Sequence, residues 1–119
     1  MDITIHKFIE VTNDDLSTGY GFIPRPRIVC MDGFSMSVQA SEYAYCYPRE
    51  NKLDKYETVE VGYTSEKDIL LPNEYDEIYA YIPIEIVQEI IEKHGGINIQ
   101  KTFHKEFNRG YLINKILDL

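Results

Sequence analysis

The chain has 119 residues, of which 44% are hydrophobic, and its formal net charge is −8 at pH 7. This length suits one domain with a modest core. The longest apolar run is far shorter than the roughly 20 residues that a membrane-spanning helix needs, so the sequence indicates no membrane segment.

The first residues, MDITIHKF, contain no basic region followed by an apolar core, so we expect no signal peptide. Cys30 and Cys46 form neither a CxxC motif nor a set of metal ligands. We therefore expect two reduced, buried thiols in a cytoplasmic protein that has no metal and no cofactor.

The charge is unevenly distributed along the chain. Residues 1–49 hold six acids and four bases, a net charge of −2. Residues 50–92 hold twelve acids and three bases, a net charge of −9, and residues 93–119 carry +3. The acidic block repels nucleic acid, so the expected partner is a basic protein surface, with no direct binding of nucleic acid through the acidic face and no membrane contact.

In chain order, Ile3, Ile5 and Ile9 alternate with polar residues, which predicts a strand followed by a polar loop. Arg25 and Arg27 flank Pro26. A grip on a phosphate is one use for such a pair, but we favour solvated charges on an edge strand.

A β-hairpin is predicted next, because Asp32-Gly33 is typical of a type I′ turn. A two-residue turn places Met31 opposite Phe34 and specifies the register. The core face of the hairpin then carries Val29, Met31, Phe34, Met36 and Val38.

Tyrosines follow in alternation with small residues. If the segment is extended, Tyr43, Tyr45 and Tyr47 stand on one side, opposite Ala44 and Cys46. Residues 56–63 predict a further strand, and residues 64–76 form an acidic connection.

The clearest segment, IYAYIPIEIVQEIIEKHGG (78–96), predicts a strand that runs directly into a helix. Ile78, Ala80 and Ile82 should share the buried face of the strand. In the helix, at about 83–94, one face collects the apolar residues, and two glycines end it. The residues expected to dock this helix are Ile86, Val87, Ile90 and Ile91.

These elements predict an α+β fold in a single domain, 1–119. We expect an antiparallel sheet of four to six strands with the amphipathic helix packed on it, and a C-terminal helical segment. Residues 1–21 would form a leader strand and loop, 22–97 the core and 98–119 a basic tail.

No catalytic constellation is visible. His6, His94 and His104 share no metal-ligand spacing, and His94 should be a partly buried residue near the end of its helix. Adjacent acids such as Asp14-Asp15 are usually solvated, and the glycines form no phosphate-binding loop. We therefore expect a protein that is not an enzyme.

Two features suggest binding: the acidic block and the ten tyrosines, which occur without a tryptophan. Tyrosine offers a large contact area at a low entropy cost, although it also suits sheets, and acids also form ordinary solubility surfaces. The predicted partner-binding residues are Glu57, Glu60, Glu66, Asp68, Glu74, Asp76, Glu77, Tyr43, Tyr45 and Tyr47.

Three segments, PRPRIVCMDGFSMSVQASEYAYCYPR, YETVEVGY and YAYIPIEIVQEIIEKHGGI, carry a family resemblance. Over about Phe22 to Ile97 the chain resembles a family of small uncharacterised proteins encoded by phages and integrative mobile elements of Firmicutes and related gut bacteria. The resemblance implies a small accessory protein in the cytoplasm of a bacterial host. It supplies no activity, cofactor or site residue.

Charge and context together favour a non-enzymatic, nucleic-acid-mimicking inhibitor of a host nucleic-acid-binding enzyme, an anti-CRISPR-like counter-defence protein. Two alternatives stay open. One is a structural or accessory subunit of a phage replication or virion complex, and the other is a small enzyme or ligand-binding domain.

Overall fold

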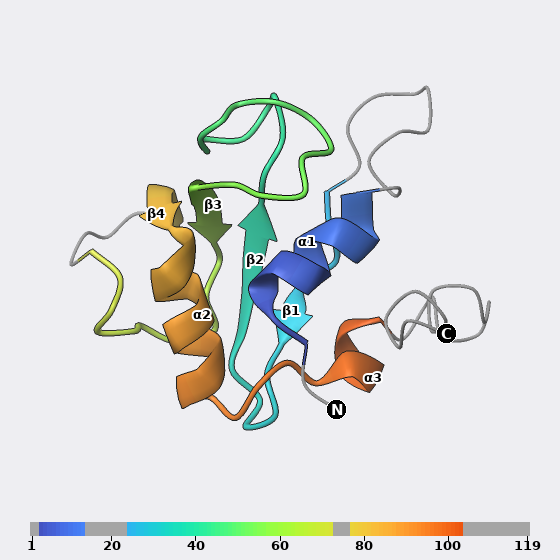
Figure 1. Ribbon diagram of the computed structural model, residues 1–119. Helices are drawn as coiled ribbons and strands as arrows, with labels where there is room; N and C mark the ends of the chain where they lie inside the picture. The colour runs from blue at the N-terminus through green and yellow to red at the C-terminus, as the bar shows by residue number, and fades with distance from the viewer. Residues whose placement is uncertain (1–2, 14–23, 73–76, 104–119) are drawn as a thin grey trace.

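A computed structural model describes residues 3–13, 24–72 and 77–103 (Figure 1). Its four strands form one antiparallel sheet in the order β1-β2-β3-β4, and α1 and α2 lie over one face of this sheet. The predicted α+β class with a four-stranded antiparallel sheet is confirmed. The elements are α1 (Ile5–Thr12), β1 (Ile28–Val29), β2 (Ser35–Gln39), β3 (Thr58–Gly62), β4 (Ile78–Pro83), α2 (Ile84–Lys93) and α3 (Ile99–Thr102).

The first described segment is a helix, so the predicted N-terminal strand was wrong. Thr4 is extended, and its hydroxyl accepts a hydrogen bond from the backbone N–H three residues later, as an N-cap residue does. Ile5, Phe8 and Ile9 are fully buried along one side of α1. Over so short a run, the apolar spacing of a strand and that of a helix coincide at several positions. Phe8 and Val11 do not fit the strand pattern, and both lie on the buried side of the helix.

The loop between β1 and β2 has three residues, 31–33, in place of the predicted two. The Cys30 N–H donates to the Phe34 carbonyl at 2.7 Å, and Ile28 pairs with Met36. The glycine of the loop has a φ of 97°, the left-handed conformation that three-residue hairpin loops need at this point.

Because the loop has one residue more than predicted, the buried and exposed faces of β1 are exchanged relative to the prediction. Because strand side chains alternate between faces, a shift of one residue moves every side chain to the other face. Ile28 and Cys30 are therefore buried, whereas Val29 is partly buried and Met31 is 60% exposed, which corrects the prediction for this strand. The predicted core positions on the other strand are confirmed, since all three are buried: Phe34, Met36 and Val38.

A β-bulge interrupts the pairing of β3 with β4. Val59 pairs with Ile82 and Val61 with Tyr79, so two residues of β4 oppose one residue of β3. One of these two is Tyr81, whose φ is 55°. The bulge breaks the alternation that the sequence suggests.

The buried face of β4 therefore differs from the prediction. Ile78 and Ala80 are exposed, whereas Tyr79 and Ile82 are buried. Of the three residues predicted for the core face, only Ile82 lies there.

The helix α2 matches the prediction for about 83–94. It begins directly after Pro83, and its buried residues include Val87, Ile90 and Ile91. Ile86, which we expected to be a docking residue, is only partly buried. Glycines with φ values of 90° and 94° follow the helix and end it, as left-handed residues commonly do.

Residues after α2 cover the outer edge of β1. The Asn98 N–H donates to the Val29 carbonyl at 2.7 Å, and Ile97 bridges Cys30. Ile97 makes only this single bridge, and a helical turn, α3, follows it. Most of the tail, 98–119, for which we expect a C-terminal helical segment, lies outside the described residues.

Arg25 is buried, which corrects the expectation of a solvated edge charge. Its side chain is only 3% exposed and ties the end of α1 to the end of β2. The guanidinium donates to the Ile9 carbonyl at 2.7 Å and to the Ala40 carbonyl at 2.8 Å. It also donates to Thr12 Oγ1 at 2.8 Å and to Asn13 Oδ1 at 2.9 Å. A cation here complements the negative end of the α1 dipole.

Candidate functional site

A loop of residues 41–49 lies beyond one end of the sheet. The loop is tied to β3, since the Tyr47 N–H donates to the Thr58 carbonyl at 3.2 Å. Ala44 and Cys46 point into the core and are 2% and 1% exposed. They hold the loop on the protein while its three tyrosines face solvent.

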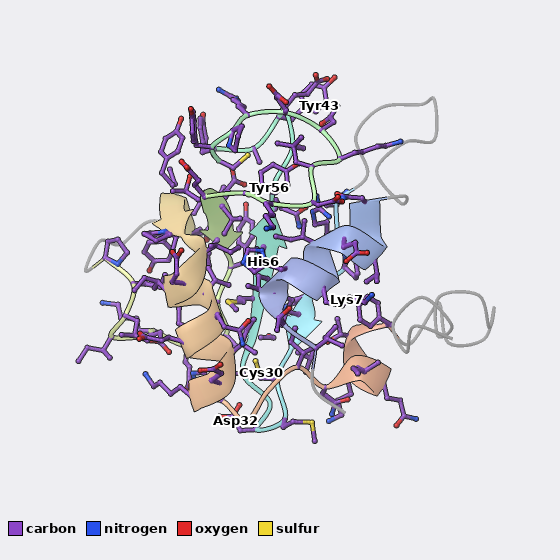
Figure 2. The ribbon with its side chains drawn as sticks, viewed as in Figure 1. His6, Lys7, Cys30, Asp32, Tyr43 and Tyr56 are labelled. Atoms are coloured by element: carbon purple, nitrogen blue, oxygen red, sulfur yellow. The ribbon has the colours of Figure 1, made fainter. Side chains whose placement is uncertain are left out.

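The predicted alternation of the loop tyrosines is confirmed, although the loop is not a regular strand. Tyr43, Tyr45 and Tyr47 are 65%, 49% and 58% exposed. Figure 2 shows Tyr43 at this end of the molecule, beyond the sheet and opposite the end that carries Asp32.

Tyr81 joins these loop tyrosines from β4. Its N–H donates to the Tyr45 carbonyl at 3.0 Å, and the centroids of the two rings lie 6.3 Å apart. The bulge in β4 leaves the Tyr81 side chain 51% exposed. We call the exposed side chains of Tyr43, Tyr45, Tyr47 and Tyr81 the tyrosine surface.

Charged groups lie against the tyrosine surface. A Glu60 carboxylate oxygen accepts from the Tyr45 N–H at 2.9 Å, and the Glu57 N–H donates to the Tyr47 carbonyl at 2.9 Å. The guanidinium carbon of Arg49 lies 5.3 Å from the centroid of the Tyr45 ring. The surface therefore combines aromatic rings with the Glu60 carboxylate and the Arg49 guanidinium.

The other predicted acids do not all belong to this surface. Glu66 and Glu77 are exposed, but the Glu77 carbonyl accepts from the Tyr63 N–H, at the far end of β3. That strand has five residues, so the two ends are roughly 16 Å apart at about 3.3 Å per residue. Glu74 and Asp76 lie outside the described residues.

Asp68 is a buried structural residue, so its prediction as a partner-binding acid was wrong. Its side chain is 1% exposed, and Lys93 Nζ lies 3.2 Å from its carboxylate. The carboxylate also accepts the Leu70 N–H at 3.0 Å. In the sequence Asp68 is one more acid in an acidic connection, and only the fold brings it to the end of α2.

His94 lies between two carboxylates. Its Nδ1 is 2.6 Å from Asp32 Oδ2, and its Nε2 is 3.0 Å from Asp68 Oδ2. The ring stacks on Phe34, with centroids 4.0 Å apart and planes 7° from parallel. An imidazole with a proton on both nitrogens donates to both carboxylates, so the protonated form of His94 joins the hairpin loop, the 63–72 loop and the end of α2.

Burial lowers the pKa of His94, but the hydrogen bonds and charges of Asp32 and Asp68 outweigh burial and raise it overall. The pKa of Asp32 is lowered, first by the Phe34 N–H and then by His94. Burial raises the pKa of Asp68, but the Leu70 N–H, His94 and Lys93 together lower it. We call Asp32, Asp68 and His94 the charged clamp, in which each ring nitrogen of His94 is hydrogen-bonded to one carboxylate.

Cys30 and Cys46 are free thiols, and both are buried. Burial, with a smaller contribution from Asp32, raises the pKa of Cys30 to about 11. Burial also raises the pKa of Cys46. A thiol so raised is protonated at neutral pH, and His94 holds its protons against carboxylates. Within residues 3–13, 24–72 and 77–103, no cluster of histidine, cysteine or acid side chains is placed to hold a metal ion.

The charged clamp predicts a stability maximum in mildly acidic solution. The raised pKa of His94 means that its contribution is complete below 6.5, the ordinary value, and is lost as the pH rises through the raised pKa. The lowered pKa values of Asp32 and Asp68 mean that their contribution is present above 3.8 and is lost as the pH falls through the lower values. Urea unfolding between pH 3 and pH 9 measures both losses.

His94→Gln should remove the alkaline loss of stability. His6→Gln is the matched control, because His6 is exposed on α1. Wild type and His6→Gln should share one pH profile. An alkaline loss of equal size in His94→Gln would show that another group titrates.

Among the described residues, no helix has the length and apolar character to cross a bilayer. Comparison of the chain with protein-family models, with curated proteins and with solved structures found no match.

Proposed function

We propose that this chain is a non-enzymatic binding protein that uses its tyrosine surface to contact a basic surface of a partner protein. One observation carries the proposal: three exposed tyrosines alternate along the 41–49 loop, and one of them, Tyr45, is in contact with the exposed Tyr81 of β4. Tyrosine is enriched at protein interfaces, where its ring packs and its hydroxyl remains able to hydrogen-bond.

Backbone hydrogen bonds fix the segments that carry the tyrosines, which lowers the conformational entropy lost on binding. Hydrogen bonds join Tyr45 to Tyr81 and Tyr47 to Thr58, while Ala44 and Cys46 anchor the loop in the core. A surface that is already ordered loses less conformational entropy when the partner docks.

Charge supports a basic partner. Glu42, Glu57 and Glu60 lie in or beside the loop, and the chain as a whole carries −8. A field of one sign speeds the encounter with a partner of the opposite sign and orients it, whereas aromatic anchors supply most of the affinity.

The chemistry of the described residues supports a role without catalysis. Both nitrogens of His94 are bonded to carboxylates, and the pKa of Cys30 is raised to about 11 by burial and by Asp32. These groups serve the clamp and the core.

The specific role that we propose is inhibition of a nucleic-acid-binding enzyme. The acidic protein would occupy the basic groove of that enzyme and exclude its nucleic acid, while binding no nucleic acid and no membrane itself. The resemblance over 22–97 implies a small accessory protein of a phage or mobile element in the bacterial cytoplasm, and a counter-defence role fits that context together with the acidic block. An accessory subunit of a replication or virion complex would use the same surface but would leave the partner free to bind nucleic acid.

A comparative pull-down tests the proposal. The bait proteins are wild type, Tyr45→Ala/Tyr81→Ala and the control Tyr63→Ala, whose tyrosine is 53% exposed at the far end of β3. A genuine partner should be captured by wild type and the control and lost with the double variant. Truncation of a tyrosine anchor costs about 2 kcal/mol or more, so the affinity of the purified partner should fall by about 30-fold or more.

Competition and salt then separate the two roles. An inhibitor should displace nucleic acid from the purified partner, and its affinity should weaken as salt rises from 50 to 500 mM. Simultaneous binding of both would favour the accessory subunit. Equal capture by the double variant and the control would contradict the tyrosine surface altogether.

A further inference from the structure

We infer that the tyrosine surface is a receptor for arginine side chains of the partner, and that Arg49 occupies this receptor in the free protein. The inference rests on the proposed function and names the chemistry that the partner presents.

The protein itself places a guanidinium on this surface. The guanidinium carbon of Arg49 lies 5.3 Å from the centroid of the Tyr45 ring, within the range of about 6 Å for a cation–π contact. Arg49 Nε also donates to the Glu42 carbonyl at 3.0 Å. The contact therefore shows that the ring of Tyr45 accepts a guanidinium in this geometry.

The surroundings of Tyr45 extend the receptor beyond one ring. The Tyr81 ring lies 6.3 Å from Tyr45 at an angle of 59°, so the two rings offer differently oriented faces. The carboxylate of Glu60 is fixed beside Tyr45 by the 2.9 Å bond from the Tyr45 N–H. An arginine on these rings meets both aromatic carbon and a carboxylate.

Arginine fits this combination better than lysine does. Its guanidinium is planar, stacks on aromatic faces and donates to a carboxylate through two parallel N–H groups. Lysine carries a compact, strongly hydrated charge that loses more hydration when it lies against a ring. The receptor should therefore distinguish the two cations, whereas net negative charge alone would not.

In the free protein, the guanidinium of Arg49 occupies the position at Tyr45 that a partner arginine would take. A partner arginine that binds Tyr45 displaces Arg49, so the apparent affinity is lower than that of the empty receptor. Removal of the Arg49 guanidinium should raise the affinity for an arginine ligand.

Two labelled peptides, nona-arginine and nona-lysine, test the inference on the full chain by fluorescence anisotropy at 150 mM salt. Nona-arginine should bind about tenfold more tightly than nona-lysine, as expected when about 1.4 kcal/mol separates the two cations. Tyr45→Leu/Tyr81→Leu should abolish this preference, and Tyr63→Leu should preserve it. Equal binding of the two peptides by wild type, or a preference that survives in the double variant, would overturn the inference.

Arg49 is tested in two ways. Arg49→Gln keeps a side-chain donor for Glu42 and should bind nona-arginine about threefold more tightly, because internal competition is gone. In the wild-type protein, the NMR signal of the Arg49 Nε–H should shift when nona-arginine is added and remain unchanged with nona-lysine. An unchanged signal with nona-arginine, or unchanged or weaker binding by a folded Arg49→Gln variant, would overturn the role of Arg49.

The results separate this inference from the proposed function. If the peptides bind equally but Tyr45→Ala/Tyr81→Ala still loses its partner in the pull-down, arginine recognition fails and the binding surface stands. If nona-arginine is preferred through Tyr45 and Tyr81 but no partner depends on them, arginine recognition stands and the proposed function fails.

Discussion

Replacement of Arg25 by methionine should destabilise the protein by roughly 3–5 kcal/mol, because each buried acceptor left without its donor costs about 1–3 kcal/mol. The guanidinium donates to the Ile9 and Ala40 carbonyls and to the side chains of Thr12 and Asn13. Methionine fills a similar length of space but donates no hydrogen bond. Urea unfolding at neutral pH measures the loss.

Arg27→Met is the matched control for Arg25→Met. Arg27 is exposed and donates to Ser35 Oγ at 2.9 Å and to the Tyr63 carbonyl, so its loss should cost less than about 1 kcal/mol. Similar losses in the two variants would show that Arg25 does not hold α1 on the sheet in the way that we describe. Loss of α1 alone would appear as increased amide exchange in 5–12 before global unfolding.

Ile90→Ala should destabilise the protein by roughly 2–5 kcal/mol, the usual cost of a large-to-small change in a packed core. Ile90 is fully buried, and its helix, α2, contacts α1 and β4. Removal of its side-chain carbons leaves a cavity that the neighbouring backbone elements cannot close. Thermal or urea unfolding measures the change.

Glu89→Ala is the control one position earlier in the same helix. Glu89 is exposed, and alanine is a strong helix former, so this change should alter stability by less than about 0.5 kcal/mol. If the two substitutions had equal and small effects, α2 would not be docked through Ile90.

The sequence by itself determined those parts of the fold in which one periodicity dominates. In α2, apolar residues recur at helical spacing, and two glycines follow, so both its extent and most of its buried face were predictable. The outward tyrosines of the 41–49 loop were predictable for a similar reason: Ala44 and Cys46 can be buried only if their larger neighbours face solvent.

Where two patterns coincide, the sequence was ambiguous. The run from Ile3 to Val11 fits both a strand and a helix, and the helix forms because the core lies on the side of Phe8 and Val11. In the hairpin, one additional loop residue exchanged the buried and exposed faces of β1 relative to the prediction, although the buried residues of the second strand were predicted correctly. A local dipeptide cannot specify whether a turn contains two residues or three when the flanking strand is so short.

Contacts between distant parts of the chain were decided by the tertiary structure alone. Asp68 looked like its acidic neighbours until the fold brought it to His94, which is 26 positions away. From the sequence, Arg25 was predicted to be a surface charge, but in the fold its guanidinium donates to the Ile9 carbonyl of α1. Tyr81 joined the tyrosine surface because a bulge turns it outward beside Tyr45. Each outcome depends on which residues and backbone N–H and C=O groups the fold brings together as partners. The spacing of residue types along the sequence does not contain that information.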